Sequence, residues 1–226
     1  MGERTVDVNV ETKETLAAVR TFIQAQAEFG LSEFRLARTD AAARLTDFHG
    51  SIRDCRMCGL CESRRAVVFG SGNPEADLMF VGEAPGAEED RTGMPFVGPA
   101  GELLTRMIEA IGFQRDEVYI ANVIKCRPPG NRDPKPEEVS TCKPFLERQI
   151  EYIQPVAICA LGLFAARTLL ETDEPMSSLR GRLFSYRGIH LIPTYHPAAL
   201  LRNRQWKRPA WEDLQHLRRV YDNAAG

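Results

Sequence analysis

The chain has 226 residues, of which 43% are hydrophobic and 27% charged, and its formal net charge is −2. This length suits one domain of moderate size with room for a short appendage. No apolar run approaches the roughly 20 residues of a membrane span and the N-terminal residues lack the apolar core of a signal peptide, so we expect a cytoplasmic monomer without membrane contact.

The first 50 residues differ in pattern from the rest of the chain. Residues 14–29 carry apolar side chains at helical spacing and end at Gly30, and a second helix is expected over residues 40–53. Neither segment contains a cluster of residues that suggests chemistry. We predict that residues 1–50 form a helical extension, packed on or tethered to a main domain of residues 51–226.

In the main domain, short apolar strands alternate with helices. Strands are predicted over residues 77–82, 118–124, 156–161 and 189–193, and helices over residues 101–111, 136–153, 163–170 and 212–222. Nearly continuous runs of Val, Ile and Leu, each followed by a helix, are typical of a parallel sheet covered on both faces. The sequence therefore predicts an α/β fold whose functional residues lie beyond the carboxyl ends of the strands.

Five of the six cysteines are spaced as metal ligands. They are Cys55, Cys58 and Cys61 in a loop, and Cys126 and Cys142 on either side of a segment rich in proline and glycine. Four thiolates complete either a zinc or an iron–sulfur site, and the spacing alone selects neither the metal nor four ligands out of five. Cys159 lies inside an apolar strand, where a buried apolar cysteine is expected.

Two segments after the first strand contain candidate binding residues. Small residues at 82–86 let the backbone approach a ligand and direct amides at it, which makes Gly86 a candidate. Glu83, the first residue beyond the strand, is placed to hold a water molecule or accept a proton. Phe96 lies in a loop stiffened by proline and bracketed by glycines, where its ring could stack on a planar base. A tight turn with a solvated acid, and a core phenylalanine, are the alternatives.

Asn122 is a polar residue inside the second apolar strand. A buried amide without partners costs about 1–3 kcal/mol, so its side chain needs hydrogen bonds. Asn presents a donor and an acceptor side by side, which suits the edge of a nucleobase. The alternative is an amide that neighbouring backbone satisfies.

The segment after the fourth strand combines a histidine with leucines and basic residues. His196 could donate to a developing anion, and Leu200 and Leu201 are expected to be exposed, as a wedge that enters a base stack. Arg202 and Arg204 are the nearest candidates for phosphate contact. No acidic residue occurs between Arg180 and Trp211, and this local basic excess suits a nucleic-acid surface, with chance clustering as the alternative.

Together these segments resemble the family 4 uracil-DNA glycosylases, the iron–sulfur members of the uracil-DNA glycosylase superfamily. The matching stretches run in family order over about two-thirds of the chain: 55–58, 67–74, 82–86, 88–90, 95–98, 122–132, Cys142 and 196–203. The resemblance implies a three-layer α/β/α sandwich around a four-stranded parallel sheet. It also implies an enzyme that flips deoxyuridine out of single- or double-stranded DNA and hydrolyses its N-glycosidic bond.

The resemblance further implies roles for individual residues. A structural 4Fe–4S cluster would be held by Cys55, Cys58, Cys126 and Cys142, with Cys61 a bystander. Uracil would stack on Phe96, in a site that includes Gly86. Asn122 would read the N3–H and O4 edge of uracil, and cytosine presents the opposite pattern. His196 would face O2 of the base, and Glu83 would position the attacking water.

Two departures from related proteins bear on the mechanism. Ala84 stands where other superfamily members have a water-activating Asp or Asn, so Glu83 is our choice of base, with Glu89 and Asn131 as helpers. The chain also lacks the Arg-rich insertion, ending in His, of the covalent uracil-binding relatives, which favours turnover. A covalent or non-catalytic uracil-DNA binder, and an iron–sulfur or zinc electron-transfer or regulatory protein, remain the alternatives.

Overall fold

The computed structural model describes residues 40–225, and the structural statements below concern that part of the chain. The helix expected over residues 14–29 lies outside the described residues. The second expected helix is confirmed as α2 (Ala41–Ile52), which packs against helix α5 (Pro136–Ile153). Its buried residues Leu45, Phe48 and Ile52 belong to the core of the main domain. The boundary after residue 50 stays a prediction.

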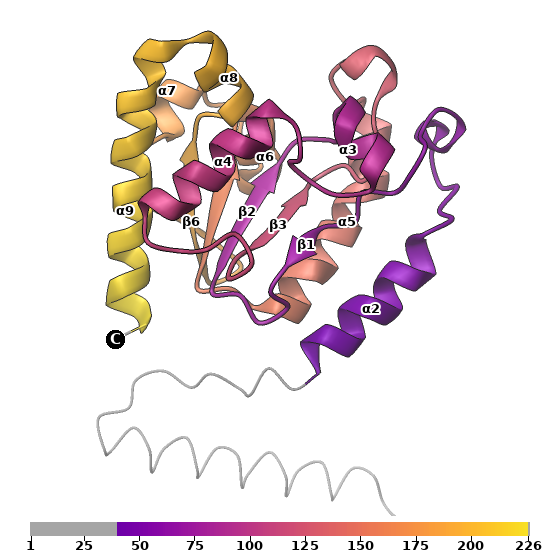
Figure 1. Ribbon diagram of the computed structural model, residues 1–226, viewed down its shortest axis with the longest axis horizontal. Coiled ribbons are helices and arrows are strands. Elements are labelled where there is room, and N and C mark those ends of the chain that lie inside the picture. The colour runs from indigo at the N-terminus through magenta and orange to yellow at the C-terminus, as the bar shows by residue number, and fades with distance from the viewer. Residues whose placement is uncertain (1–39, 226) are drawn as a thin grey trace, which may run out of the picture. The chain divides into compact units, whose positions relative to one another are not determined.

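A six-stranded sheet forms the centre of the domain, in the order β1-β3-β2-β4-β6-β5 (Figure 1). The four inner strands are parallel and match the four predicted ones: β2 (Leu78–Gly82), β3 (Tyr119–Asn122), β4 (Ala157–Leu161) and β6 (Ile189–Thr194). Two short antiparallel strands at the edges were not predicted, β1 (Ser71–Gly72) and β5 (Phe184–Tyr186). They are too short for a sequence period to show.

Besides α2, seven α-helices within residues 40–225 cover or flank the sheet. They are α3 (Ala87–Thr92), α4 (Pro99–Ala110), α5, α6 (Leu163–Leu170), α7 (Met176–Leu179), α8 (Pro197–Arg202) and α9 (Lys207–Ala225). The helix predicted over residues 212–222 begins earlier, at Lys207, because Pro209 lies in the first turn, where a helix tolerates proline. Within residues 40–225, no helix is both long and apolar enough to cross a membrane.

Strand residues alternate between the two faces of the sheet, and helices bury both faces. Met79 and Val81 of β2 belong to a core shared with α2, α5 and α6, whereas Leu78 and Phe80 belong to a second core shared with α4, α8 and α9. Successive side chains of a strand point to opposite faces, so an all-apolar strand requires cover on both sides. The predicted three-layer α/β/α sandwich is thereby confirmed.

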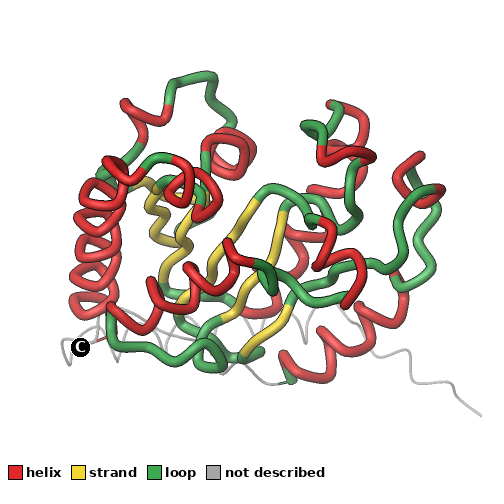
Figure 2. The backbone as a smooth tube through the Cα atoms, turned by 45° about the horizontal axis from the view of Figure 1, so that its top comes forward, coloured by secondary structure: helices red, strands yellow, loops and turns green. Residues whose placement is uncertain are grey.

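The inner strands are parallel and in register, so they end together at one edge of the sheet. Figure 2 shows the strands at the centre of the domain, with loops connecting them to the helices. Gly82 of β2 is in register with Asn122 of β3, and Leu161 of β4 with Thr194 of β6. The residues that follow these strand ends therefore meet, as expected for a doubly covered parallel sheet.

Candidate active site and thiol cavity

A cavity of about 440 Å³ opens at the carboxyl edge of the inner strands. Its lining includes all five residues that the sequence singled out for catalysis or base binding, namely Glu83, Gly86, Phe96, Asn122 and His196. The predicted DNA contact Arg202 also lines it, together with Asp133, which the sequence analysis did not select. The structure thus brings together residues from four separate segments, whose roles remain predictions.

Asn122 is the last residue of β3 and only 2% exposed. Among the described residues, its Oδ1 atom is buried and has no hydrogen-bond partner. A methyl group on Gly82 would clash with this oxygen and would lie 2.6 Å from Cζ of Phe96, so only glycine lets the amide and the ring approach each other. The alternative of an amide satisfied by backbone is wrong for this oxygen, which is an acceptor without a partner on a residue that lines the cavity.

Phe96 is buried and adopts a positive φ of 53°, a conformation that costs a non-glycine residue on the order of 1–3 kcal/mol. Two side chains hold its loop in place. The Arg115 guanidinium donates to the carbonyl oxygens of Pro95 and Phe96 at 2.8 and 2.9 Å. Oε1 of Glu89 accepts from the two amides that follow Phe96, at 3.0 and 3.3 Å. Sequence reasoning missed Arg115, because a lone arginine far along the chain shows no sign of this contact.

His196 precedes α8 and lines the cavity. Its Nδ1 accepts a hydrogen bond from the amide of Ala198 at 3.1 Å, so Nε2 carries the proton of the neutral ring. Burial, and then the charge of Arg202, lower the pKa of His196 to about 4. At neutral pH His196 is therefore an uncharged donor through Nε2, and its expected role at the base stays a prediction.

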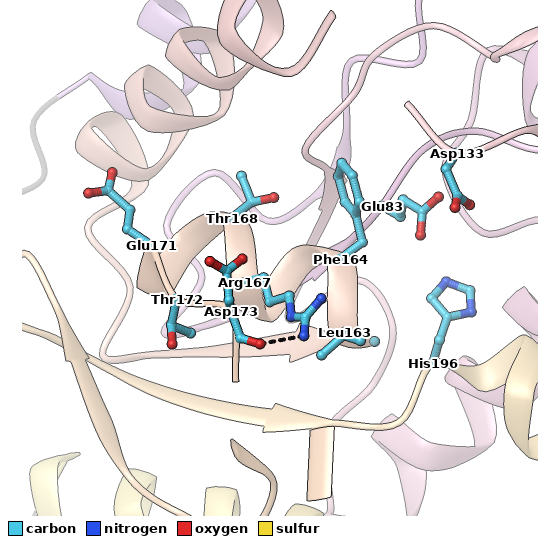
Figure 3. Close-up of a pocket in the computed structure, with 11 residues that line it drawn as sticks. Glu83, Asp133, Leu163, Phe164, Arg167, Thr168, Glu171, Thr172, Asp173 and His196 are labelled. Atoms are coloured by element: carbon cyan, nitrogen blue, oxygen red, sulfur yellow. Dashed lines mark hydrogen bonds between the residues drawn. The ribbon is translucent and has the colours of Figure 1, made fainter. Parts of the chain in front are cut away.

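Glu83 follows β2 directly, as expected, and its side chain is partly buried. Burial, and then the charge of Asp133, raise the pKa of Glu83 above its ordinary value. Glu83, Asp133 and His196 also line a second cavity of about 650 Å³, which extends along α6 (Figure 3). Asp133 could have been found in the sequence as the first acid after the second predicted strand, at the same sheet edge as Glu83.

The two helper residues, and the amide of Gly86, have other partners in the structure. Besides the two amides of the Phe96 loop, the Glu89 carboxylate accepts from the amide of Gly86 at 3.1 Å. Oδ1 of Asn131 accepts from Arg127 at 2.8 Å. These hydrogen bonds favour Glu83 over Glu89 and Asn131 as the group that handles water.

The predicted leucine wedge is wrong in one of its two residues. Leu200 is 2% exposed and packs within α8 into the core shared with α4 and α9, whereas Leu201 is 44% exposed. The helical turn of α8 separates the two side chains, so adjacent residues face opposite environments. Of these two leucines, only Leu201 can contact a bound macromolecule.

We expect this difference to appear in the free energy of unfolding. Leu200→Ala should lower it by about 2–5 kcal/mol, because the change leaves a cavity in a packed core. Leu201→Ala should change it by less than about 0.5 kcal/mol, because that side chain is exposed. Urea unfolding of both variants measures the difference, and equal effects would contradict the burial of Leu200.

The basic surface is smaller than the sequence indicates. Four of the seven basic residues between Arg180 and Trp211 pair with acids: Arg180 with Asp213, Arg182 with Glu174, Arg187 with Glu147 and Arg208 with Glu212. For the other three, Arg202, Arg204 and Lys207, no ion pair is found within residues 40–225. The predicted contacts Arg202 and Arg204 are therefore among the cations free to meet phosphates.

Four cysteines line a common cavity that the last residue of α2, Ile52, also lines. They are Cys55, Cys58, Cys126 and Cys142, whereas Cys61 does not line it and Cys159 is buried in β4 as expected. Apolar side chains enclose the cavity, and two donors point at sulfur: the Lys125 amide lies 3.2 Å from Sγ of Cys142, and Arg64 lies 3.5 Å from Sγ of Cys126.

The donor set of this cavity fits an iron–sulfur group. Four thiols with N–H donors beside the sulfurs are the typical setting of such a cluster. Which metal these thiols hold stays a prediction.

Comparisons with known proteins agree with this architecture. The sequence model of the Uracil DNA glycosylase superfamily matches residues 69–215. The chain is 45% identical to a Type-4 uracil-DNA glycosylase of Thermotoga maritima, over 73% of this chain and 88% of the relative. It is 43% identical to one of Sulfurisphaera tokodaii (74% and 80%) and 42% identical to one of Archaeoglobus fulgidus (76% and 91%). The chain therefore belongs to the type-4 uracil-DNA glycosylases of the uracil-DNA glycosylase superfamily.

Proposed function

We propose that this protein removes uracil from DNA, by flipping deoxyuridine out of the strand and hydrolysing its N-glycosidic bond to leave an abasic site. The observation that carries the proposal is the buried, unpartnered Oδ1 of Asn122, which lies in a cavity with the Phe96 ring and the neutral His196. The substrate is uracil-containing DNA, single- or double-stranded. The relatives named above support this function.

The cavity selects uracil by its hydrogen-bonding edge. Oδ1 of Asn122 accepts from N3–H of the base, and the amide nitrogen donates to O4. Cytosine offers an acceptor at N3 and a donor at C4, so it would leave both groups of Asn122 unpaired, which costs about 1–3 kcal/mol for each. Phe96 supplies the face on which the flipped base stacks. Gly86 lines the same cavity, and a side chain there would collide with the Glu89 carboxylate that holds the Phe96 loop.

The chemical step separates charge between the two sides of the cavity. As the N-glycosidic bond breaks, negative charge develops on the base and Nε2–H of His196 donates to O2. A water molecule held by Glu83 adds to C1′ of the sugar cation, and its proton passes to the Glu83 carboxylate. One donor aimed at the developing charge is typically worth about 10²–10³ in rate.

In this proposal, residues of α8 and of the turn after it bind the DNA. Arg202 and Arg204 contact phosphates, and the exposed Leu201 fills the gap left by the flipped base. Leu200 has no contact with DNA and anchors α8 from below.

We propose that Cys55, Cys58, Cys126 and Cys142 hold a 4Fe–4S cluster. When bound, the cluster supplies a covalent link between the loop at 55–58 and the segment that follows β3. Lys125 connects this region to the base-reading residue: its amide donates to Sγ of Cys142, and its buried Nζ donates to the carbonyl oxygen of Asn122 at 2.7 Å. Anchoring the cysteines thus supports the backbone that carries Asn122.

The cysteine assignment predicts opposite results for two serine variants. Cys142→Ser should lose most of the bound iron and the visible absorption of the cluster, because a serine oxygen is a poor replacement for a thiolate ligand. Cys61→Ser should retain both, because its side chain does not line the cavity. Iron content and absorption spectra of the purified proteins measure this, and cluster loss in Cys61→Ser would overturn the choice of ligands.

The proposal extends to the setting of the protein, which acts in the cytoplasm as a monomer. None of the six cysteines, which all lie within residues 40–225, forms a disulfide in the structure, as expected in a reducing compartment. Light scattering of the purified full chain tests the oligomeric state.

The proposed activity is tested with an oligonucleotide that contains one deoxyuridine. Incubation with a catalytic amount of protein, followed by alkali, should cleave the strand at that position and leave a thymine control intact. A heat-stable protein–DNA adduct without cleavage would instead indicate a covalent uracil-DNA binder. No reaction from protein with an intact cluster would overturn the proposed function.

A further inference from the structure

Two carboxylates lie at the junction of the two cavities. Among the described residues, Glu83, Asp133 and His196 are the only ones that line both the 440 Å³ and the 650 Å³ cavity. Figure 3 shows the Glu83 and Asp133 side chains next to each other, with His196 set apart from them. The catalytic cavity therefore has a neutral donor on one side and two acids on the other.

The backbone around Asp133 is firmly held, while its carboxylate is left open. Arg132 donates to the carbonyl oxygen of Asp133 at 2.9 Å and forms a two-pronged ion pair with Glu138, at 2.6 and 2.8 Å. Oε2 of Glu138 also accepts from the amide of Lys135 at 2.8 Å. For the Asp133 carboxylate itself, no hydrogen bond or ion pair is found within residues 40–225. A fixed backbone with a free acid suits a group that acts on its surroundings by charge.

We infer that Asp133 is a positioning residue of the reaction. Its carboxylate lies with that of Glu83 on the side of the cavity where the attacking water binds, and it sets the pH range in which Glu83 works as a base. The inference rests on the proposed uracil excision for its catalytic part. A carboxylate beside Glu83 favours the protonated acid that forms when water gives up its proton. It also places negative charge near the sugar, where a cation develops.

Other charged groups around Glu83 are mostly neutralised by partners. The groups that line either cavity with it are Glu89 on α3, Arg132 after β3, Arg167, Glu171 and Asp173 on and after α6, and His196 and Arg202 at α8. Glu89 accepts from three amides, Arg132 pairs with Glu138, Arg167 donates to two carbonyl oxygens, and Glu171 pairs with Lys143. Arg202 faces the cavity as a free cation, and Asp133 is the acid whose charge raises the pKa of Glu83, after burial.

The acid limb of the pH profile belongs to Glu83 in this arrangement. Glu83 is the proposed base, and burial and then the charge of Asp133 raise its pKa from 4.5. The acid limb of kcat/KM reports the base of the free enzyme. Removing the Asp133 charge lowers the pKa of Glu83, and activity then persists to lower pH.

Asp133→Asn tests the inference against Asp173→Asn, a matched control. Asp173 is an exposed acid that lines the second cavity only, so both variants lose one negative charge. In Asp133→Asn we expect the acid limb of kcat/KM to move down by roughly 0.5 pH unit, as for a partly screened neighbouring charge, and the plateau to fall several-fold. Asp173→Asn should change neither, and Asp133→Glu should restore the wild-type limb. An unmoved limb in Asp133→Asn, or an equal shift in Asp173→Asn, would overturn the inference.

A second readout separates this inference from the excision activity. Carbon-13 NMR of the Glu83 carboxyl, assigned by its absence in Glu83→Gln, follows the titration in DNA-free protein. A lower midpoint in Asp133→Asn supports the carboxylate pair even if the wild-type protein proves inactive, a result that would overturn the proposed function alone. An unchanged midpoint overturns the pair even in an active enzyme.

Discussion

Asn122→Ala is expected to lower kcat/KM for uracil excision by about 10²–10³. The variant loses two hydrogen bonds to the base of about 1.5–2 kcal/mol each, and each 1.36 kcal/mol corresponds to a factor of ten in rate. In the free protein its Oδ1 lies buried without a partner. The free energy cost of removing this oxygen from water is therefore incurred on folding, and the amide is in position before the base binds. Single-turnover cleavage of a deoxyuridine oligonucleotide, at saturating and limiting protein, measures the effect.

The same variant should fold normally. Since Oδ1 of Asn122 forms no hydrogen bond within the described residues, its removal deletes an unsatisfied polar atom and leaves only a small cavity. We expect the free energy of unfolding to change by about 1 kcal/mol or less and DNA binding to persist. Excision within threefold of wild type would remove Asn122 from base recognition, and global unfolding would contradict the account of its unpartnered oxygen.

His196→Ala is expected to lower the rate of bond cleavage by about 10²–10³, while binding of uracil-DNA changes much less. The ring is fixed by the amide of Ala198 at Nδ1, and its neutral state leaves Nε2–H as the donor to O2. A donor whose partner gains charge only during reaction contributes chiefly to kcat. Single-turnover rates together with DNA affinity separate the two effects, and a loss of affinity at an unchanged rate would contradict the assigned role.

The lowered pKa of His196 also predicts that the free energy of unfolding depends on pH. Its pKa is about 4 in the folded protein and 6.5 as an ordinary histidine, so between these values the unfolded chain binds more protons. The stability of the folded state is therefore fully present above pH 6.5 and falls as the pH drops toward 4. At 1.36 kcal/mol per unit, the wild type should lose roughly 2 kcal/mol more than His196→Ala between pH 7.5 and 5. Urea unfolding at the two pH values tests this, and parallel curves would contradict a buried neutral ring.

The local sequence pattern was sufficient to predict the apolar strands and the polar residues that lie within them or directly follow them. The four inner strands are runs of apolar residues, because burial on both faces leaves no position for a polar side chain. Asn122 is conspicuous for the same reason, as an amide in such a run, and Glu83 and His196 follow strand ends that must share one edge. The thiol spacing indicated a metal site but left its ligands open.

Contacts between distant segments decided the rest. Arg180 meets Asp213 and Arg187 meets Glu147, so arginines that form a basic cluster in the sequence are largely neutralised in space. Leu200 and Leu201 are neighbours in the chain, yet α8 turns one into the core and the other to solvent. Asp133 lies beside Glu83 only because β2 and β3 pair in parallel. Composition and period along the sequence determine which strand residues are buried and which strand ends meet. The partner of a charge and the buried side of a short helix depend on side chains far away in the chain, so they are decided only when the layers pack.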